Sequence, residues 1–179
     1  MPAPAAPFVL NGRFLTRQAT GVDRFAIELM RAWRLPPMAP GWPLPLRHAG
    51  RRTGHAWEQL ELPRAAGGRP LVNLCNTAPA LREAQLVVLH DAASAANPGN
   101  YSLAFRAWYR VLLTALMRRA RVVATVSRFS ADELQRHFGP RRPHQASLEV
   151  IGEGGEHILR EPADVDILRR LGLAGRRYV

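Results

Sequence analysis

Residues 87–91 read Val87-Val88-Leu89-His90-Asp91. A short apolar run of this kind predicts a strand that is buried on both faces, which is typical of a parallel sheet covered by helices. The run ends in two titratable residues, His90 and Asp91. Because ligands bind at the carboxyl ends of strands in open α/β sheets, both residues are candidates for a functional site. The alternative for His90 is a buried structural histidine.

Similar apolar runs recur along the chain and alternate with stretches of helical periodicity. Strands are predicted over residues 8–10, 71–74, 86–90, 122–126 and 148–151, with residues 43–47 as a further candidate weakened by two prolines. Helices are predicted over residues 22–34, 102–119, 130–138 and 163–171. This alternation predicts an α/β fold, a Rossmann-like parallel sheet with helices on both faces.

The charge and the cysteine content of the chain exclude several kinds of site and indicate which kinds of partner it could bind. The chain has 25 basic and 14 acidic residues, a net charge of +11, and every basic residue is arginine. The absence of lysine excludes a lysine Schiff base and a Walker lysine, since both need an ε-amine. Cys75 is the only cysteine, which excludes an intrachain disulfide and a multi-cysteine zinc site. The positive charge fits phosphate-bearing partners, whether nucleotides, nucleic acid or an anionic lipid surface.

The N-terminal residues and the length of the apolar runs predict where in the cell the protein is found. Residues 2–7 are only proline and alanine, without the basic segment of a secretory signal. No stretch reaches the roughly 20 consecutive apolar residues that a membrane span needs. With the single cysteine, these features predict a cytoplasmic protein, either soluble or peripheral on a membrane face.

A second motif, Thr20-Gly21-Val22-Asp23-Arg24, opens the predicted helix 22–34. A helix N-terminus presents unpaired N–H groups and a partial positive charge, and a glycine there lets a phosphate or hydroxyl approach the backbone. The alternative is purely structural, with Thr20 capping the helix and Gly21 permitting a tight turn. The G-x-G-x-x-G spacing of a dinucleotide-binding fingerprint is missing.

Polar residues also follow other predicted strands. Asn76 and Thr77 follow the strand 71–74, and Ser127 and Arg128 follow the strand 122–126. Because the carboxyl ends of parallel strands share one edge, these residues are expected to line the same cleft as His90. Arg128 can bind a phosphate or carboxylate through two hydrogen bonds.

Several other segments have structural interpretations. Ser130, followed by Glu133, predicts a capping box at the start of a helix. Residues 35–52 are rich in proline, glycine and arginine and predict a long surface loop, and the glycine-rich residues 152–157 predict a flexible connection. Glu58 and Glu61 form an acidic island on one helix face, suited to metal binding or acid catalysis, with a solvated or arginine-paired face as the alternative.

In this order, the motifs resemble the N-terminal domain of the family 4 glycosyltransferases, the retaining enzymes with the two-domain GT-B fold. The resemblance covers nearly the whole chain and rests on residues 11–15, 20–29, 71–77, 87–91, 125–130 and 150–157. It implies transfer of a sugar from a nucleotide-sugar donor, without a metal or other cofactor, to a glycan or lipid-linked acceptor in polysaccharide biosynthesis.

The resemblance also implies roles for individual residues. The Thr20-Gly21-Val22 backbone would lie beside the donor phosphates, and His90, with Asp91 as the second candidate catalytic residue, would contact the transferred sugar. The remaining candidates would line the acceptor side: Arg24, Asn76, Thr77, Ser127 and Arg128.

The resemblance further implies a division into domains. Residues 1–175 would form the acceptor-side domain, and residues 176–179 would begin a C-terminal donor-binding domain, so the chain alone is expected to be nearly inactive. The helix 102–119, which carries arginines beside Trp108 and Tyr109, is a candidate for contact with an anionic membrane. The alternatives are a basic nucleic-acid-binding module, disfavoured because the arginines are scattered and no recognised motif occurs, and an interaction domain without catalysis.

Overall fold

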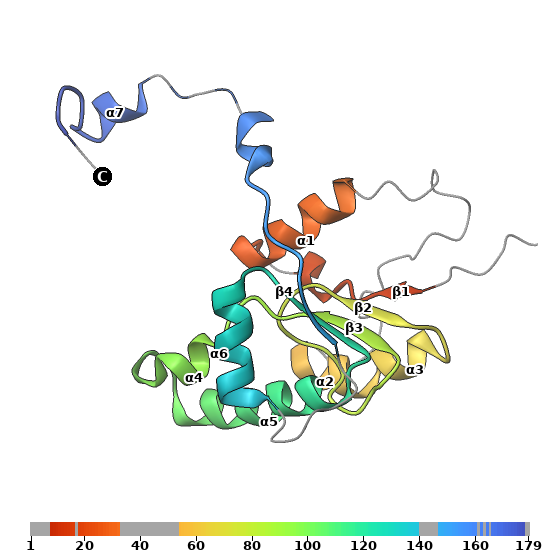
Figure 1. The fold of residues 1–179 in the computed structure, drawn as a ribbon. Coiled ribbons are helices and arrows are strands. Elements are labelled where there is room, and N and C mark those ends of the chain that lie inside the picture. The colour runs from red at the N-terminus through yellow and green to blue at the C-terminus, as the bar shows by residue number, and fades with distance from the viewer. Residues whose placement is uncertain are drawn as a thin grey trace, which may run out of the picture.

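The computed structural model describes residues 8–16, 18–32, 54–139, 147–160, 162, 164 and 166–177. Within these residues the chain forms an α/β fold on a sheet of five parallel strands, which follow one another across the sheet in chain order (Figure 1). The strands are β1 (Val9–Leu10), β2 (Leu71–Asn73), β3 (Gln85–Val88), β4 (Val122–Thr125) and β5 (Ser147–Val150). The predicted Rossmann-like parallel sheet is therefore confirmed.

The connections contain helices and short 3₁₀ turns. The helices are α1 (Gly21–Ala32), α2 (Gly54–Leu60), α3 (Leu62–Ala66), α4 (Ala93–Ala96), α5 (Leu103–Arg119), α6 (Arg128–Phe138) and α7 (Ile167–Arg170). The 3₁₀ turns are η1 (Arg13–Thr16), η2 (Pro98–Asn100) and η3 (Glu156–Arg160). No helix in the described part of the chain is long and apolar enough to cross a bilayer.

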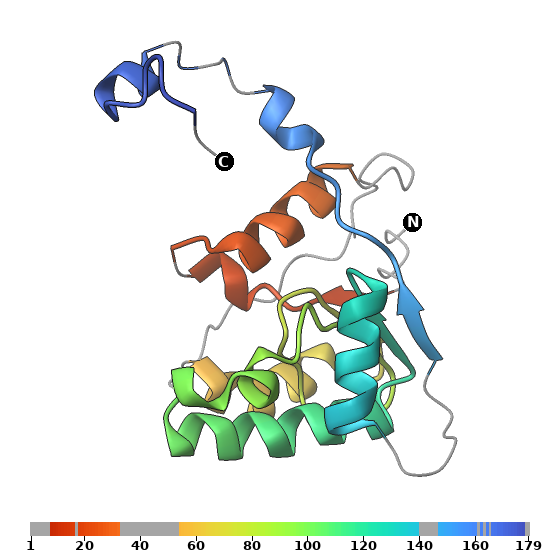
Figure 2. The same ribbon diagram turned by 60° about the vertical axis from the view of Figure 1, so that its left-hand side comes forward.

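Helices cover both faces of the sheet, because successive residues of a strand point to opposite sides. On one face, Val87 and Val123 pack with α5 and α6, while Val9 and Leu71 pack with α2 and α3. On the other face, Leu10, Val88 and Ala124 pack with α1. Figure 2 shows α1 on one side of the sheet and α5 on the other.

The observed ends of the strands and helices differ from the predicted ones by a few residues. Strand β3 ends at Val88, so His90 lies two residues beyond the ladder rather than inside it. The helix predicted over residues 102–119 is α5, and Ser102 is its N-cap, with a hydroxyl that accepts a hydrogen bond from the Phe105 amide at 3.3 Å. The helix predicted over residues 163–171 is described only as the single turn Ile167–Arg170.

The capping box predicted at Ser130 is wrong. Helix α6 begins two residues earlier, because Ser127 leaves β4 with an extended backbone and its hydroxyl accepts the Ser130 amide at 3.0 Å. Ser130 therefore lies in the first turn of the helix, and Glu133 pairs with Arg136 and His137 instead.

The chain leaves the sheet after β5. Residues 151–160 run past α1, and α7 lies beyond them, away from the sheet (Figures 1 and 2). Arg176 and Arg177, which the resemblance places at the start of a second domain, are not in a strand. The possible strand at residues 43–47 and the loop predicted over residues 35–52 lie outside the described residues.

Candidate functional site at the carboxyl edge of the sheet

The His90 ring is held in one orientation just beyond the end of β3. It is 7% exposed, and its Nε2 lies 3.0 Å from the Leu74 carbonyl oxygen. A carbonyl oxygen only accepts hydrogen bonds, so this contact assigns the ring proton to Nε2. The Phe25 ring of α1 packs edge-on against the imidazole, with centroids 4.8 Å apart. No hydrogen bond to Nδ1 occurs within the described part of the chain, and in the neutral form of the ring that nitrogen is an acceptor.

Asn76 holds the backbone of His90 in place. Its Oδ1 accepts a hydrogen bond from the His90 amide at 2.6 Å, and its own amide donates to the Val88 carbonyl at 3.1 Å. Asn76 has φ = 62°, in the left-handed region that asparagine tolerates better than most residues. These two hydrogen bonds join the loop after β2 to the end of β3. The Nδ2 group of Asn76 makes no hydrogen bond to the described residues and remains a donor.

The N-terminus of α1 lies beside the same loop, since the Cys75 thiol reaches the Val22 carbonyl at 3.7 Å. Asp23 Oδ2 accepts hydrogen bonds from the Thr20 amide at 2.9 Å and the Thr20 hydroxyl at 2.7 Å. Asp23 therefore reaches back to cap the helix, and the Thr20 hydroxyl is the donor of that contact. The space beside Gly21 is open, because a Cβ there would meet no atom within 4 Å.

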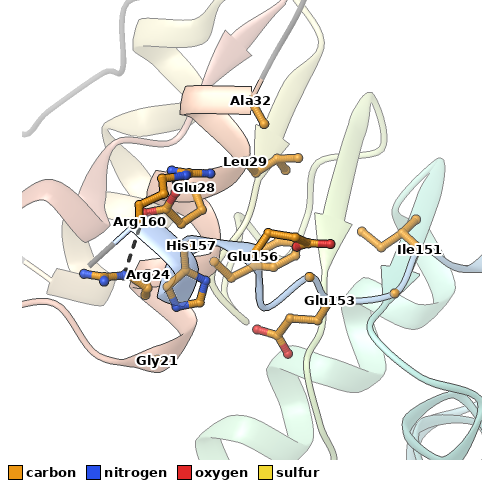
Figure 3. A pocket seen from close by; sticks show the side chains of 13 residues that line it. Gly21, Arg24, Glu28, Leu29, Ala32, Ile151, Glu153, Glu156, His157 and Arg160 are labelled. Carbon is orange, nitrogen blue, oxygen red and sulfur yellow. Dashed lines mark hydrogen bonds and ion pairs between the residues drawn. The ribbon is translucent and has the colours of Figure 1, made fainter. Parts of the chain in front are cut away.

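A groove of about 480 Å³ lies between α1 and residues 151–160 (Figure 3). It brings Gly21 and Arg24, at the start of α1, together with the glycine-rich turn that follows β5. The carboxylate of Glu28 forms an ion pair across this groove with the guanidinium of Arg160, at 2.6 Å. It also pairs with Arg31 and Arg24. Burial alone would raise the pKa of Glu28, but the hydrogen bond from Arg160 and the neighbouring arginine charges outweigh it and lower that pKa.

Other predicted site residues have local structural contacts. Asp91 Oδ1 accepts the Ala93 amide at 2.8 Å, at the start of α4. The Ser127 hydroxyl accepts the Ser130 amide and donates to the Ser130 hydroxyl at 3.1 Å, so both of its hydrogen-bonding roles are used. Arg128 is exposed in the first turn of α6. The structure therefore brings His90, Asn76 and the start of α1 together, whereas Ser127 acts as a helix cap.

A buried carboxylate near this edge was not predicted. Glu58 of α2 is fully buried and pairs with Arg13, so the arginine-paired alternative is confirmed, whereas its burial was not expected. Its Oε1 accepts hydrogen bonds from Asn11 Nδ2 and Thr77 Oγ1, both at 2.8 Å. Its Oε2 accepts one from Arg13 at 3.0 Å, and His55 Nδ1 lies 3.4 Å from the same oxygen. We call these five residues the Glu58 cluster.

The Glu58 cluster keeps its carboxylate charged. Burial alone would raise the pKa of Glu58, but the nearby His55 ring, the Arg13 guanidinium and the hydrogen bonds from Asn11 and Thr77 together lower it. Arg13 also donates to the Thr77 hydroxyl at 2.8 Å, so Thr77, predicted on the acceptor side, uses its hydroxyl inside the cluster. The available signal was the position of Asn11 and Thr77 just after β1 and β2, the same signal that singled out His90.

Within the described residues, no group of three or more His, Cys, Asp or Glu side chains is arranged to hold a metal ion. Comparisons of the chain with protein-family models, with curated proteins and with solved structures find no match. The fold and site define an α/β protein with a polar site where the carboxyl ends of its strands meet the start of α1.

Proposed function

We propose that this chain is the acceptor-side half of a retaining glycosyltransferase, which transfers a sugar from a nucleotide-sugar donor to a glycan or lipid-linked acceptor. The observation that carries the proposal is the fixed His90 ring, with Nε2 bound to the Leu74 carbonyl and Nδ1 open. Nδ1 in this tautomer accepts a hydrogen bond from a hydroxyl, which a sugar offers and an ionised phosphate does not. The Nδ2 group of Asn76, which has no hydrogen-bond partner among the described residues, adds a donor, so the pair complements a hydroxyl that both donates and accepts.

Other residues have roles that follow their placement. The open backbone at Gly21 and the partial positive charge of the α1 N-terminus suit the donor phosphates. Arg24 lines the adjacent groove, and Asp91 and Arg128 are exposed. In this proposal the nucleotide itself is held mainly by a second domain, as the resemblance to family 4 glycosyltransferases implies.

The outer face of α5 supports contact with an anionic membrane, where a lipid-linked acceptor would be found. Trp108 and Tyr109, predicted to make this contact, instead pack against the core. Leu103 and Val111 are 78% and 65% exposed, and Arg110 and Arg118 lie on the same side of the helix. Apolar side chains flanked by arginines are typical of helices that lie on the headgroup region.

The experiment is a calorimetric titration of the chain, at low and at high salt. The ligands, each tested separately, are neutral oligosaccharides, nucleotide-sugars and duplex DNA. We expect an oligosaccharide to bind, and His90→Gln to weaken that binding about tenfold, the loss of one hydrogen bond to a ligand hydroxyl. Glutamine retains a donor for the Leu74 carbonyl, so the fold is expected to persist. Tight DNA binding that falls steeply with salt, without oligosaccharide binding, would instead identify a nucleic-acid-binding module.

A further inference from the structure

The fully buried Glu58 has no part in the proposed function, yet it joins segments that do. Its hydrogen-bond partners come from the loops that follow two neighbouring strands. Asn11 and Arg13 follow β1, and Thr77 follows β2. An ionised carboxylate is rarely buried completely unless charged and polar partners satisfy it, and here they come from both loops.

The loop after β2 that Glu58 contacts is the loop that holds His90. Leu74 supplies the carbonyl for the imidazole, and Asn76 supplies the side-chain oxygen for the His90 amide. Thr77 is the next residue, and its hydroxyl donates to Glu58 at 2.8 Å. A chain of contacts therefore runs from Glu58 through Thr77 and Asn76 to His90.

Helix α2 holds this loop at further points. Gln59, adjacent to Glu58, donates through Nε2 to the Ala78 carbonyl and accepts the Ala80 amide on Oε1, both at 2.8 Å. The helix is itself anchored by Trp57, which packs in the core with Val9. The loop is thus fixed from the α2 side over residues 77–80.

We propose that Glu58, acting through Thr77, is a positioning residue that sets the orientation of the His90 imidazole. The role in sugar binding rests on the proposed function, whereas the effect on His90 itself does not. Thr77 then belongs to the support of the site and not to the surface that contacts the acceptor, because its hydroxyl already donates to Glu58 and accepts from Arg13.

The test compares two identical substitutions at buried threonines. Thr77→Val removes the hydroxyl that Glu58 holds. Thr125→Val is the matched control, because Thr125 is fully buried in β4 and its hydroxyl has no hydrogen-bond partner among the described residues. The readouts are the imidazole ¹⁵N–¹H correlations of His90, which report the protonated nitrogen, and the exchange rate of the His90 amide that Asn76 protects.

We expect Thr77→Val to reduce the Nε2-protonated signal of His90 and to speed exchange of its amide about tenfold or more, while exchange in β4 stays unchanged. Thr125→Val is expected to alter neither readout. A His90 tautomer and exchange rate unchanged in Thr77→Val would overturn the positioning role. If Thr77→Val does not fold, Glu58→Gln, which keeps the size of the side chain, is measured by the same criteria.

Oligosaccharide affinity separates the two proposals. If Thr77→Val shifts the His90 signals and weakens binding, both stand. If the His90 signals shift but the wild-type chain binds no oligosaccharide, the proposed function fails and Glu58 remains a positioning residue for His90. If binding weakens without any change at His90, Glu58 does not act through His90.

Discussion

The imidazole Nε2 of His90 and the backbone carbonyl of Leu74 are joined by a hydrogen bond of 3.0 Å that crosses from the end of β3 to the loop after β2. The Phe25 ring of α1 packs edge-on against the imidazole, with centroids 4.8 Å apart. The histidine is therefore held by one neighbouring loop and by one helix across the sheet. A ring fixed in this way presents one defined nitrogen, which is what selective recognition of a hydroxyl requires.

Two substitutions at His90 are expected to separate binding from folding. His90→Gln retains a donor for the Leu74 carbonyl, so the free energy of unfolding should change by no more than about 1 kcal/mol. His90→Ala leaves that carbonyl unpaired and removes a buried ring, so it should lose about 2 to 4 kcal/mol. Both should weaken oligosaccharide binding about equally. Urea unfolding and calorimetry measure the two effects, and loss of affinity only in the destabilised His90→Ala would mean that the ring is structural.

Removal of the Glu58 carboxylate is expected to be among the most damaging changes in the chain. Glu58→Ala leaves the Arg13 charge and the Asn11 and Thr77 groups without their partner and should cost about 3 to 5 kcal/mol. Glu58→Gln should cost about 1 to 3 kcal/mol, because an amide oxygen remains as an acceptor. The control is Glu83→Gln. The carboxylate of Glu83 is exposed and lies 4.0 Å from Arg119, so its replacement should change the free energy of unfolding by less than about 0.5 kcal/mol. Equal, small losses at both positions would show that the cluster adds no stability.

The lowered pKa of Glu58 predicts a pH dependence of stability. In the folded chain, the pKa of its carboxyl lies below the ordinary value of 4.5. As the pH falls, the Glu58 carboxylate therefore takes up its proton more readily in the unfolded chain than in the folded chain. The contribution of Glu58 is thus fully present above pH 4.5 and is lost as the pH falls through the folded pKa. Stability of the wild type should therefore decrease more steeply on acidification than that of Glu58→Gln. The pKa of Glu28 is also lowered, but this affects the wild type and Glu58→Gln equally and cancels in the comparison. Parallel curves of stability against pH for the two proteins would contradict the prediction.

Ser127 is expected to act on stability alone. Ser127→Ala removes the hydroxyl that caps α6 and should destabilise the chain by about 1 kcal/mol. Oligosaccharide affinity should stay unchanged, because both hydrogen-bonding roles of that hydroxyl are used within the helix. Ser102→Ala, which removes the equivalent cap of α5, is the control and should show a similar loss. A specific loss of affinity in Ser127→Ala would return this residue to the binding surface.

The outer face of α5 predicts binding to anionic vesicles. Replacing both Arg110 and Arg118 by glutamine should reduce co-sedimentation with phosphatidylserine vesicles about thirtyfold, at about 1 kcal/mol for each arginine near the surface. The control replaces Arg169 and Arg170, which lie on α7 and pair with Asp166 and Asp164. Equal loss in both double variants would indicate a general effect of charge and no specific role for α5.

Much of the fold could be predicted because its signals are local. The apolar runs at β2, β3 and β4 and the periodicity of α5 depend on neighbouring residues, and they locate the elements to within a few residues. The start of α6 was placed too late because Ser127 and Ser130 both suit a cap, and only the extended backbone after β4 selects Ser127. Capping preference alone does not separate the two positions.

The candidate site was predicted in part. The shared carboxyl edge of the strands predicts that Asn76 and His90 lie near each other, and they do. The role of Thr77 and the burial of Glu58 depend on contacts between residues 19 positions apart, which no local pattern reveals. The sequence predicts an arginine partner for Glu58 as one alternative, and Arg13 confirms it. Complete burial of Glu58 was not predicted, because acidic side chains are mostly exposed.

Chemical-shift mapping of the backbone during titration with an oligosaccharide locates the sugar-binding site on the folded chain. We expect the largest shifts at His90, Asn76 and Phe25, with smaller shifts at Gly21, and we expect His90→Gln to need about tenfold more oligosaccharide to reach the same shifts. Shifts confined to residues away from the carboxyl edge of the sheet, or the same titration midpoint in His90→Gln, would contradict the placement of a sugar-binding site at His90.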